Sequence, residues 1–378
     1  MPPRFIIQDQ GTIRETRDDS PQRPRKRQRT DSGIDTGGYS DNCLASTGPV
    51  EDDPEFYRPE AAADCVVRVG NVRFKIQRSL LYDASPVLQD ILERHHATDA
   101  PLVLIADSDE FRALAWALYT SPQERAAQPR EHEDLDRLLL IAGITRQYRC
   151  ASLEAWSMAA ILRTVTADSA FIASCSSALF RRIVDCAVRT RSDALLEATL
   201  SQWAARIMRG DAPCVPAILA ADAHELSHFR GIAYYAHIQV MTAQQTALTE
   251  RGATQFQTDP KLSNAQVMRL LSGHWSLVSL WERLRRTPPK FSCAQNCGGR
   301  CVLAMEERWM VAAASSKINA LSSASVLALL AAMRDLLAVD QELTKKIPAQ
   351  CKLAALEAMK LTSKLVEDGL ADHFFGWL

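Results

Sequence analysis

The sequence predicts an α+β fold in which a small sheet covered by helices is followed by an all-α C-terminal region. Two short runs rich in β-branched residues, at 65–69 and 72–76, are separated only by a Gly-Asn pair. This pair suits the positive φ angles of a two-residue hairpin loop, so the runs are expected to be antiparallel strands. A Ser-Pro pair at 85–86 predicts a helix start. After residue 166, apolar residues recur mostly at helical spacing.

The second predicted strand has one apolar face, because Val72, Phe74 and Ile76 alternate with polar side chains. A layer of helices must cover that face. The residues from Leu80 to Tyr82 and from Val87 to His96 are expected to form these helices.

The elements expected next continue the same layer. A strand is expected at Leu102 to Ile105, and a helix after it, because Asp107 and Glu110 have the spacing of a capping box. The polar stretch from Pro122 to Glu133 contains proline and is expected to be a surface loop. Helical spacing resumes at Leu135.

The stretch from residue 64 to 91 resembles the opening of the BTB/POZ domain: an aspartate before a strand, a second strand ending in Phe-Lys-hydrophobic, a helix, and then Ser-Pro. The matching residues are Asp64, Phe74, Lys75, Ser85 and Pro86. The order of elements to about residue 165 is similar as well, and the whole arrangement looks like fungal BTB-containing proteins. The resemblance implies contacts with other proteins through this region and no enzymatic activity. Homo-oligomer formation through it is an alternative.

Two further BTB activities depend on additional sequence features. Strand-exchanged dimers use an extra helix and strand before the hairpin, and only Phe56 to Ala63 is expected to lie there. Adaptors of cullin-RING ubiquitin ligases carry a hydrophobic-x-Glu motif after the Ser-Pro helix, and His96 and Thr98 occupy those positions here. The hydrophobic-x-Glu motif is thus absent. A cullin substrate adaptor stays an alternative to the interaction module.

Composition indicates a globular protein with more than one region. The 378 residues are 47% hydrophobic and 24% charged, which is ordinary for folded domains. We expect a leader at 1–60, a BTB-like domain at 61–165 and a helical domain at 166–378. The net charge of −1 argues against a surface adapted to nucleic acid, so no direct nucleic-acid partner is expected.

No uninterrupted apolar run reaches the roughly 18 residues of a membrane helix, and no signal peptide is recognised at the N-terminus. We therefore expect no membrane partner and an intracellular location, in the nucleus or the cytoplasm. The ten cysteines are then expected to be buried thiols or metal ligands rather than disulfides.

The leader has no apolar periodicity and is expected to be disordered. Basic residues alternate with prolines and glutamines between positions 21 and 29, which resembles a nuclear localisation signal. The candidate import residues are Arg25, Lys26, Arg27 and Arg29. A solvated charge run that keeps the leader soluble is an equal alternative.

Two motifs in the C-terminal region suggest zinc chemistry. His224, Glu225 and His228 match the H-E-x-x-H signature, in which two imidazoles on one helical face bind zinc and the glutamate activates water. The third ligand would come from Glu250 or Tyr234. A zinc hydrolase is a remote alternative, because an ordinary solvated helix explains the same residues.

The second motif is Cys293, Cys297 and Cys301, with glycines between the last two cysteines. Three thiolates could hold a structural zinc with a fourth ligand from elsewhere, for instance His274. The alternative is a group of thiols without metal in the core. No other cofactor is expected.

The helical region is expected to contain four main helices and a core rich in aromatic residues. The expected helices are Asp168 to Ala187, Ala194 to Met208, Val267 to Leu284 and Val326 to Val339. The expected helix breakers are Gly210, Pro213, Pro216, Pro288 and Pro289. The residues expected in the core are Trp275, Trp281, Trp309, Tyr234 and Tyr235.

Overall fold

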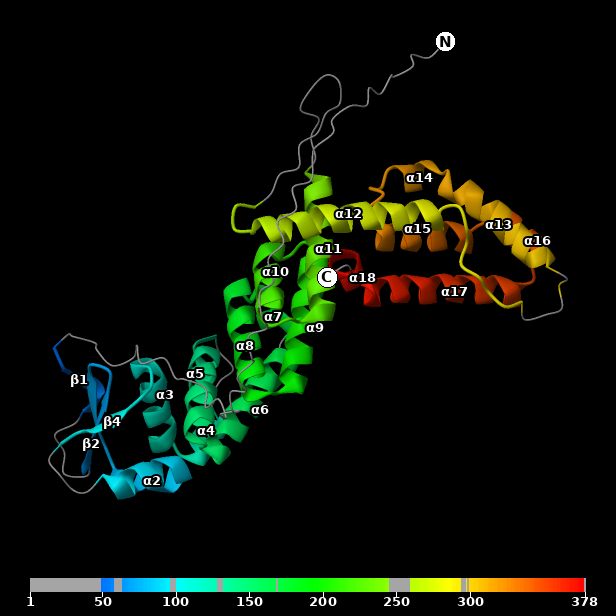
Figure 1. Cartoon of the computed structure of the whole chain (residues 1–378). Helices are drawn as coiled ribbons and strands as arrows, with labels where there is room; N and C mark the ends of the chain where they lie inside the picture. The colour runs from blue at the N-terminus through cyan, green and yellow to red at the C-terminus, as the bar shows by residue number, and fades with distance from the viewer. Residues whose placement is uncertain are drawn as a thin grey trace, which may run out of the picture. The chain divides into compact units, whose positions relative to one another are not determined.

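A computed structural model of the chain describes residues 49–57, 63–95, 100–127, 132–167, 169–244, 259–293, 297 and 299–376. The chain divides into two units, Met1–Ala45 and Ser46–Leu378. All described residues belong to the second unit, whose small sheet lies at the N-terminal end of a long series of helices (Figure 1).

The sheet of the described residues has the strand order β1-β3-β2-β4. Its strands are β1 (Glu51–Tyr57), β2 (Cys65–Val69), β3 (Val72–Ile76) and β4 (Leu102–Leu104). β2 and β3 form the predicted antiparallel hairpin, with Val67 opposite Phe74 and Gly70 at φ +57° in the loop. β4 lies parallel to β2 and β1 parallel to β3. The hairpin and the strand near 102–105 are thus confirmed.

β1 corrects the predicted boundary of the leader, because residues 51–57 belong to the sheet. Asp53 is 1% exposed, and its carboxylate accepts hydrogen bonds from the backbone N–H groups of Glu55 (3.0 Å) and Phe56 (2.8 Å). The guanidinium of Arg112 donates to the same carboxylate at 2.9 Å. Backbone pairing with β3, the buried aspartate and the apolar side chain of Phe56 therefore attach a segment whose composition resembles a loop.

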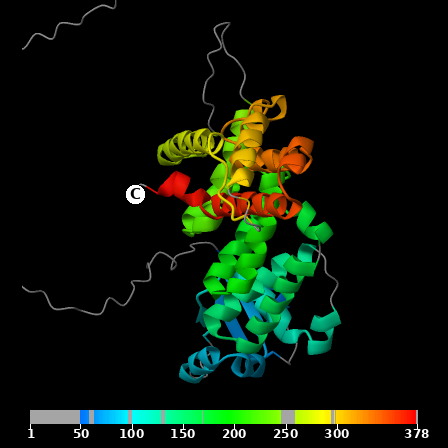
Figure 2. The same ribbon diagram turned by 90° about the vertical axis from the view of Figure 1, so that its right-hand side faces the viewer.

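Helices cover one face of the sheet (Figures 1 and 2). The helices between the hairpin and residue 167 are α1 (Arg78–Ala84), α2 (Pro86–Arg94), α3 (Ser108–Tyr119), α4 (Pro122–Ala127), α5 (His132–Tyr148) and α6 (Ala151–Ala167), and α1, α2, α3 and α5 contribute most of the helical residues in the core under the sheet. As predicted, Ser85 caps α2: its Oγ accepts from the backbone N–H groups of Val87 and Leu88, both at 3.1 Å. The rings of Phe74 and Phe111 pack edge to face at 4.8 Å in the core beneath. The loop expected at 122–133 is wrong, since α4 and the first residues of α5 lie there.

The remaining helices build the C-terminal region. They are α7 (Ser169–Ser174), α8 (Ser177–Thr190), α9 (Asp193–Arg209), α10 (Cys214–Ala223), α11 (Ser227–Ala243), α12 (Asn264–Leu284), α13 (Arg300–Ala313), α14 (Ser316–Asn319), α15 (Val326–Ala338), α16 (Gln341–Lys346), α17 (Ala349–Asp368) and α18 (Leu370–Phe375). The all-α character of this region is confirmed. The helix expected at 168–187 is interrupted, because Ser176 caps a new helix, α8. Pro216 does not end a helix, because it lies in the first turn of α10, where a missing N–H is tolerated.

The two cores of the described residues share α5. Ile141 and Ile144 belong to the core under the sheet, whereas Leu135 and Leu139 belong to the helical core. α6 is divided in the same way, with Leu153 in the first core and residues further along in the second. The domain boundary at 165/166 stays a prediction.

The aromatic core is confirmed with one exception. Trp281, Trp309, Tyr234 and Tyr235 are buried, but the side chain of Trp275 is 74% exposed. Trp275 shares α12 with Trp281, six residues away, and six residues at about 100° each place two side chains on different faces. Helical spacing indicated a buried face but not which residues belong to it.

α18 packs unusually close to α11 and α12. A Cβ atom at Gly273 would lie 2.1 Å from the Phe374 ring, and one at Gly231 would lie 2.4 Å from the backbone nitrogen of Ala371. Only glycine permits this approach. On the same side, the guanidinium of Arg230 lies 3.7 Å from the ring centroid of Phe375.

Candidate metal centre

Four cysteine side chains meet beside α13 and α17. The Sγ atoms of Cys293, Cys297, Cys301 and Cys351 all lie within 4.8 Å of one another. Cys297 and Cys351 are 3.7 Å apart at sulfur. Cys301 and Cys351 are buried, whereas Cys293 and Cys297 are half-buried.

Local backbone geometry brings the first three cysteines together. Cys297 lies just before α13, and Cys301 is the second residue of that helix. Gly299 is the N-cap between them and has a φ of +79°, a left-handed conformation that favours glycine. The chain therefore turns sharply, and the Cys297 carbonyl accepts a 3.2 Å hydrogen bond from the backbone N–H of Arg300.

The fourth cysteine comes from the first turn of α17. Cys351 follows Pro348, the N-cap residue of that helix, and is fully buried. α15 packs against both α13 and α17 and so links them (Figure 1). The expectation that His274 supplies the fourth ligand is corrected by this placement. No spacing pattern connects Cys351 with the other three, so the sequence offered no signal for it.

One sulfur–sulfur distance in the cluster agrees with the edge of a tetrahedral metal site. Zn–S bonds of about 2.3 Å place the sulfurs of a tetrahedral site roughly 3.8 Å apart, and the 3.7 Å between Cys297 and Cys351 agrees with that edge. A disulfide needs about 2.05 Å between sulfurs. The four thiols are therefore grouped closely enough for a metal ion, and the 3.7 Å pair is too far apart for a disulfide.

Proton affinity in the cluster is high when no cation is present. Burial, with added effects of the Cys297 and Cys351 thiols, raises the pKa of Cys301 to about 12. Burial also raises the pKa of Cys293, and the neighbouring Cys351 adds to the effect. A divalent cation at the centre would reverse this preference, because it stabilises thiolates directly. Metal ligation and thiol protonation are therefore the two alternatives for this cluster.

The H-E-x-x-H residues do not form the expected zinc site. His224 is the C-cap of α10, Glu225 has a φ of 52°, and His228 lies in the first turn of α11. The two histidines therefore do not share one helical face. Nε2 of His224 instead lies 2.6 Å from a carboxylate oxygen of Asp185.

Neither residue expected as the third zinc ligand is placed as a ligand in the described structure. Tyr234 is buried, and its hydroxyl donates to Asp222 at 2.9 Å. Glu250 lies outside the described residues. The import candidates Arg25, Lys26, Arg27 and Arg29 lie outside them too, as do His96 and Thr98.

Among the described residues, no helix combines the length and the apolar character that crossing a membrane requires.

Comparisons of the chain with protein-family models, with curated proteins and with solved structures found no match.

Proposed function

We propose that the chain is a non-enzymatic protein–protein interaction module of BTB/POZ type. The resemblance of residues 64–91 is supported by topology: a hairpin, a helix pair, and a strand, β4, that returns parallel to β2. Covering helices lie on one face of this sheet, as a BTB domain requires. The fungal type and an intracellular location belong to the same proposal.

The observation that carries an interaction role is the exposed edge of the sheet. Leu102 and Leu104 of β4 are buried, whereas Val103 is 60% exposed and Ile105, just after the strand, is 66% exposed. β4 pairs only with β2 in the described sheet. An edge strand with outward apolar side chains offers a partner both backbone groups and apolar surface.

Affinity purification from cells tests this role. We expect the double substitution Val103→Glu and Ile105→Glu to remove a defined set of partners that the unchanged chain retains. Both side chains point away from the core, so thermal stability is expected to be kept. Val339→Glu is the matched control, because Val339 is 77% exposed on the helical region. The same partners on all three proteins would reject the β4 edge as the binding surface.

The same experiment separates the alternatives. Recovery of a cullin would support a ubiquitin-ligase adaptor, and recovery of a tagged second copy would support homo-oligomers. No direct nucleic-acid partner is proposed.

We also propose that the four-cysteine cluster holds a structural zinc ion. Bound zinc would link the chain before α13 to the first turn of α17 and satisfy four thiolates at once. The ligands would be Cys293, Cys297, Cys301 and Cys351.

Metal analysis of the purified protein tests the zinc proposal. We expect about one zinc per chain, and a large loss of zinc in Cys297→Ser. Cys214→Ser is the control, because Cys214 is a buried cysteine of α10 outside the cluster. Full zinc content in the Cys297 variant would contradict the proposal, and absence of any metal would leave the protonated-thiol alternative.

A further inference from the structure

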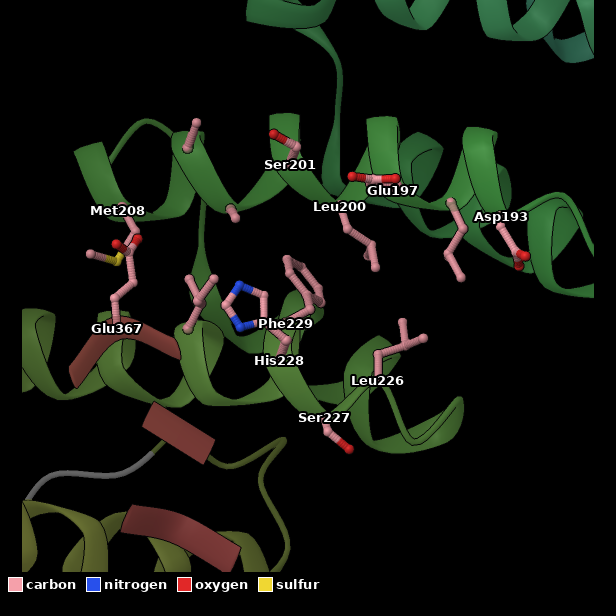
Figure 3. A pocket seen from close by; sticks show the side chains of 14 residues that line it. Asp193, Glu197, Leu200, Ser201, Met208, Leu226, Ser227, His228, Phe229 and Glu367 are labelled. Atoms are coloured by element: carbon pink, nitrogen blue, oxygen red, sulfur yellow. The ribbon is translucent and has the colours of Figure 1, made fainter. Parts of the chain in front are cut away.

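A long groove runs between α9 and α11 and ends near α17 (Figure 3). Its volume is about 780 Å³. In Figure 3, Leu200 projects into it from α9, while His228 and Phe229 project from α11. Met208 and Glu367 lie at one end and Asp193 at the other.

One whole face of α9 forms a wall of the groove. The residues of this face recur every three or four positions, and its apolar members are Leu196, Leu200, Ala204, Ala205 and Met208. The opposite face of α9 is buried and includes Trp203. From the first to the last wall residue, Asp193 to Met208, the face extends roughly 22 Å at 1.5 Å per residue.

The other wall continues the apolar surface. Leu226 precedes α11 and is partly exposed, whereas Phe229 and Ile232 lie behind it and are nearly fully buried. The break at Glu225, whose φ is 52°, separates α11 from α10 and so sets the direction of this wall. The trough is open to solvent and lined mostly by apolar side chains, together with Ser201, Ser227 and His228.

Apart from His228, the ionisable side chains that line the groove are all carboxylates. Asp193 and Glu197 lie toward one end and Glu367 at the other, and no lysine or arginine is among the described residues that line it. An anionic membrane surface would be repelled by these carboxylates. A partner with an apolar stripe and basic residues near its two ends is complementary in both respects.

The backbone of both walls is helical, so it has no free strand edge to offer to an extended peptide. We infer that the groove between α9 and α11 binds a basic amphipathic helix of a partner protein. Apolar side chains of that helix, spaced three and four residues apart, contact Leu200 and Leu226. Its lysine or arginine side chains pair with Glu197 and Glu367. This surface is separate from the β4 edge, so the two proposals fail independently.

The probe is a fluorescent peptide of about 18 residues, built from leucine and lysine in an amphipathic helical pattern. Fluorescence anisotropy with the full chain measures its dissociation constant at about 50 mM and about 500 mM salt. We expect saturable binding that weakens at the higher salt. A scrambled peptide of the same composition is expected to bind at least about tenfold more weakly, because it lacks the apolar stripe.

Two substitutions separate the charge from the apolar contribution. Glu197→Lys is expected to weaken binding about fivefold or more at low salt, and Glu357→Lys, on α17 outside the groove, is the control with the same charge change. Met208→Gln is expected to weaken binding at both salt concentrations. Leu353→Gln is its control, since Leu353 is exposed outside the groove.

Equal binding of the scrambled peptide, or equal losses in Glu197→Lys and Glu357→Lys, would overturn the inference. The β4 variant with Val103→Glu and Ile105→Glu is expected to bind the peptide as tightly as the unchanged chain. Circular dichroism confirms that each variant is folded, so lost binding is not mistaken for unfolding.

Discussion

The Sγ atoms of Cys297 and Cys351 lie 3.7 Å apart although 54 residues separate the two cysteines along the chain. Nothing local brings them together, because one precedes α13 and the other opens α17. The packing of both helices against α15 does so. The cluster is therefore a product of the tertiary fold, and metal binding is expected to report on that fold.

Removal of metal is expected to destabilise the helical region. A chelator should lower the melting temperature of the unchanged chain, because it removes a link between segments far apart in sequence. The same treatment should leave Cys351→Ser unchanged, since this variant lacks a ligand from the start. Equal shifts in both proteins would show that the chelator acts elsewhere. Differential scanning fluorimetry measures both shifts.

Alkaline pH is expected to destabilise the metal-free protein. Burial raises the pKa of the Cys186 and Cys214 thiols from 9.0 to about 11. A raised pKa in the folded state favours the protonated thiol, so this stabilisation is complete below pH 9 and is lost as pH rises toward 11. Each thiol contributes at most about 2 to 3 kcal/mol.

Urea unfolding at several pH values between 8 and 11 measures this slope. Cys214→Ala is expected to make it shallower, because one titrating group is gone. An unchanged slope in that variant would assign the alkaline loss to other groups, such as Tyr235, whose pKa burial raises to about 12.

Gly273→Ala is expected to destabilise the chain by about 1 to 3 kcal/mol. The new Cβ atom would lie 2.1 Å from the Phe374 ring, so the ring or α18 must move. In an ordinary helix interior the same change would stabilise by up to about 1 kcal/mol, so the sign of the effect is the test.

Two controls support the steric explanation for Gly273. Ser272→Ala, at an exposed neighbour on α12, should change stability by less than about 0.5 kcal/mol. In the background of Phe374→Ala, the further change Gly273→Ala should cost little, because the ring that it meets is absent. Additive losses in this double variant would contradict the contact.

Asp53→Ala is expected to cost about 2 to 4 kcal/mol. The buried carboxylate accepts two backbone hydrogen bonds and pairs with Arg112, and all three would be lost. Asp52→Ala is the neighbouring control, because Asp52 is exposed and pairs with Arg73 at the surface. Its loss should stay below about 1 kcal/mol. Equal losses at both positions, by chemical denaturation, would argue against the anchoring of β1.

Replacement of Arg25, Lys26, Arg27 and Arg29 by alanine is expected to shift the protein from nucleus to cytoplasm. Basic clusters of this kind are read by import receptors through their charge. Fusion to a large fluorescent reporter prevents passive entry, and imaging gives the nuclear fraction. Arg14→Ala with Arg17→Ala is the control in the same leader. An unchanged nuclear fraction would remove the import hypothesis.

Local signals predicted the elements that local chemistry determines. Gly70 with Asn71 predicted the β2–β3 hairpin, and Ser85 predicted the start of α2. β1 was missed, because its attachment depends on Asp53 meeting Arg112, 59 residues away. Helix ends were predicted less accurately: Pro216 was expected to break a helix but lies in the first turn of α10.

The candidate sites also divide into residues that local spacing predicted and residues that only the tertiary fold brings together. Cys293, Cys297 and Cys301 were found by spacing, but Cys351 became visible only when α17 was placed beside them. The H-E-x-x-H pattern depended on one continuous helix, and the left-handed backbone at Glu225 breaks that helix. Sequence spacing describes a site only where the backbone between the residues is regular.

The division of α5 between the two cores has a consequence for cooperativity. Leu139 and Ile144 lie on the same helix but belong to different cores. Unfolding of α5 would therefore remove buried side chains from both cores at once. The sheet region and the helices after it should therefore lose structure in one transition on heating. A protease cut within α5 would release neither half as an intact fragment.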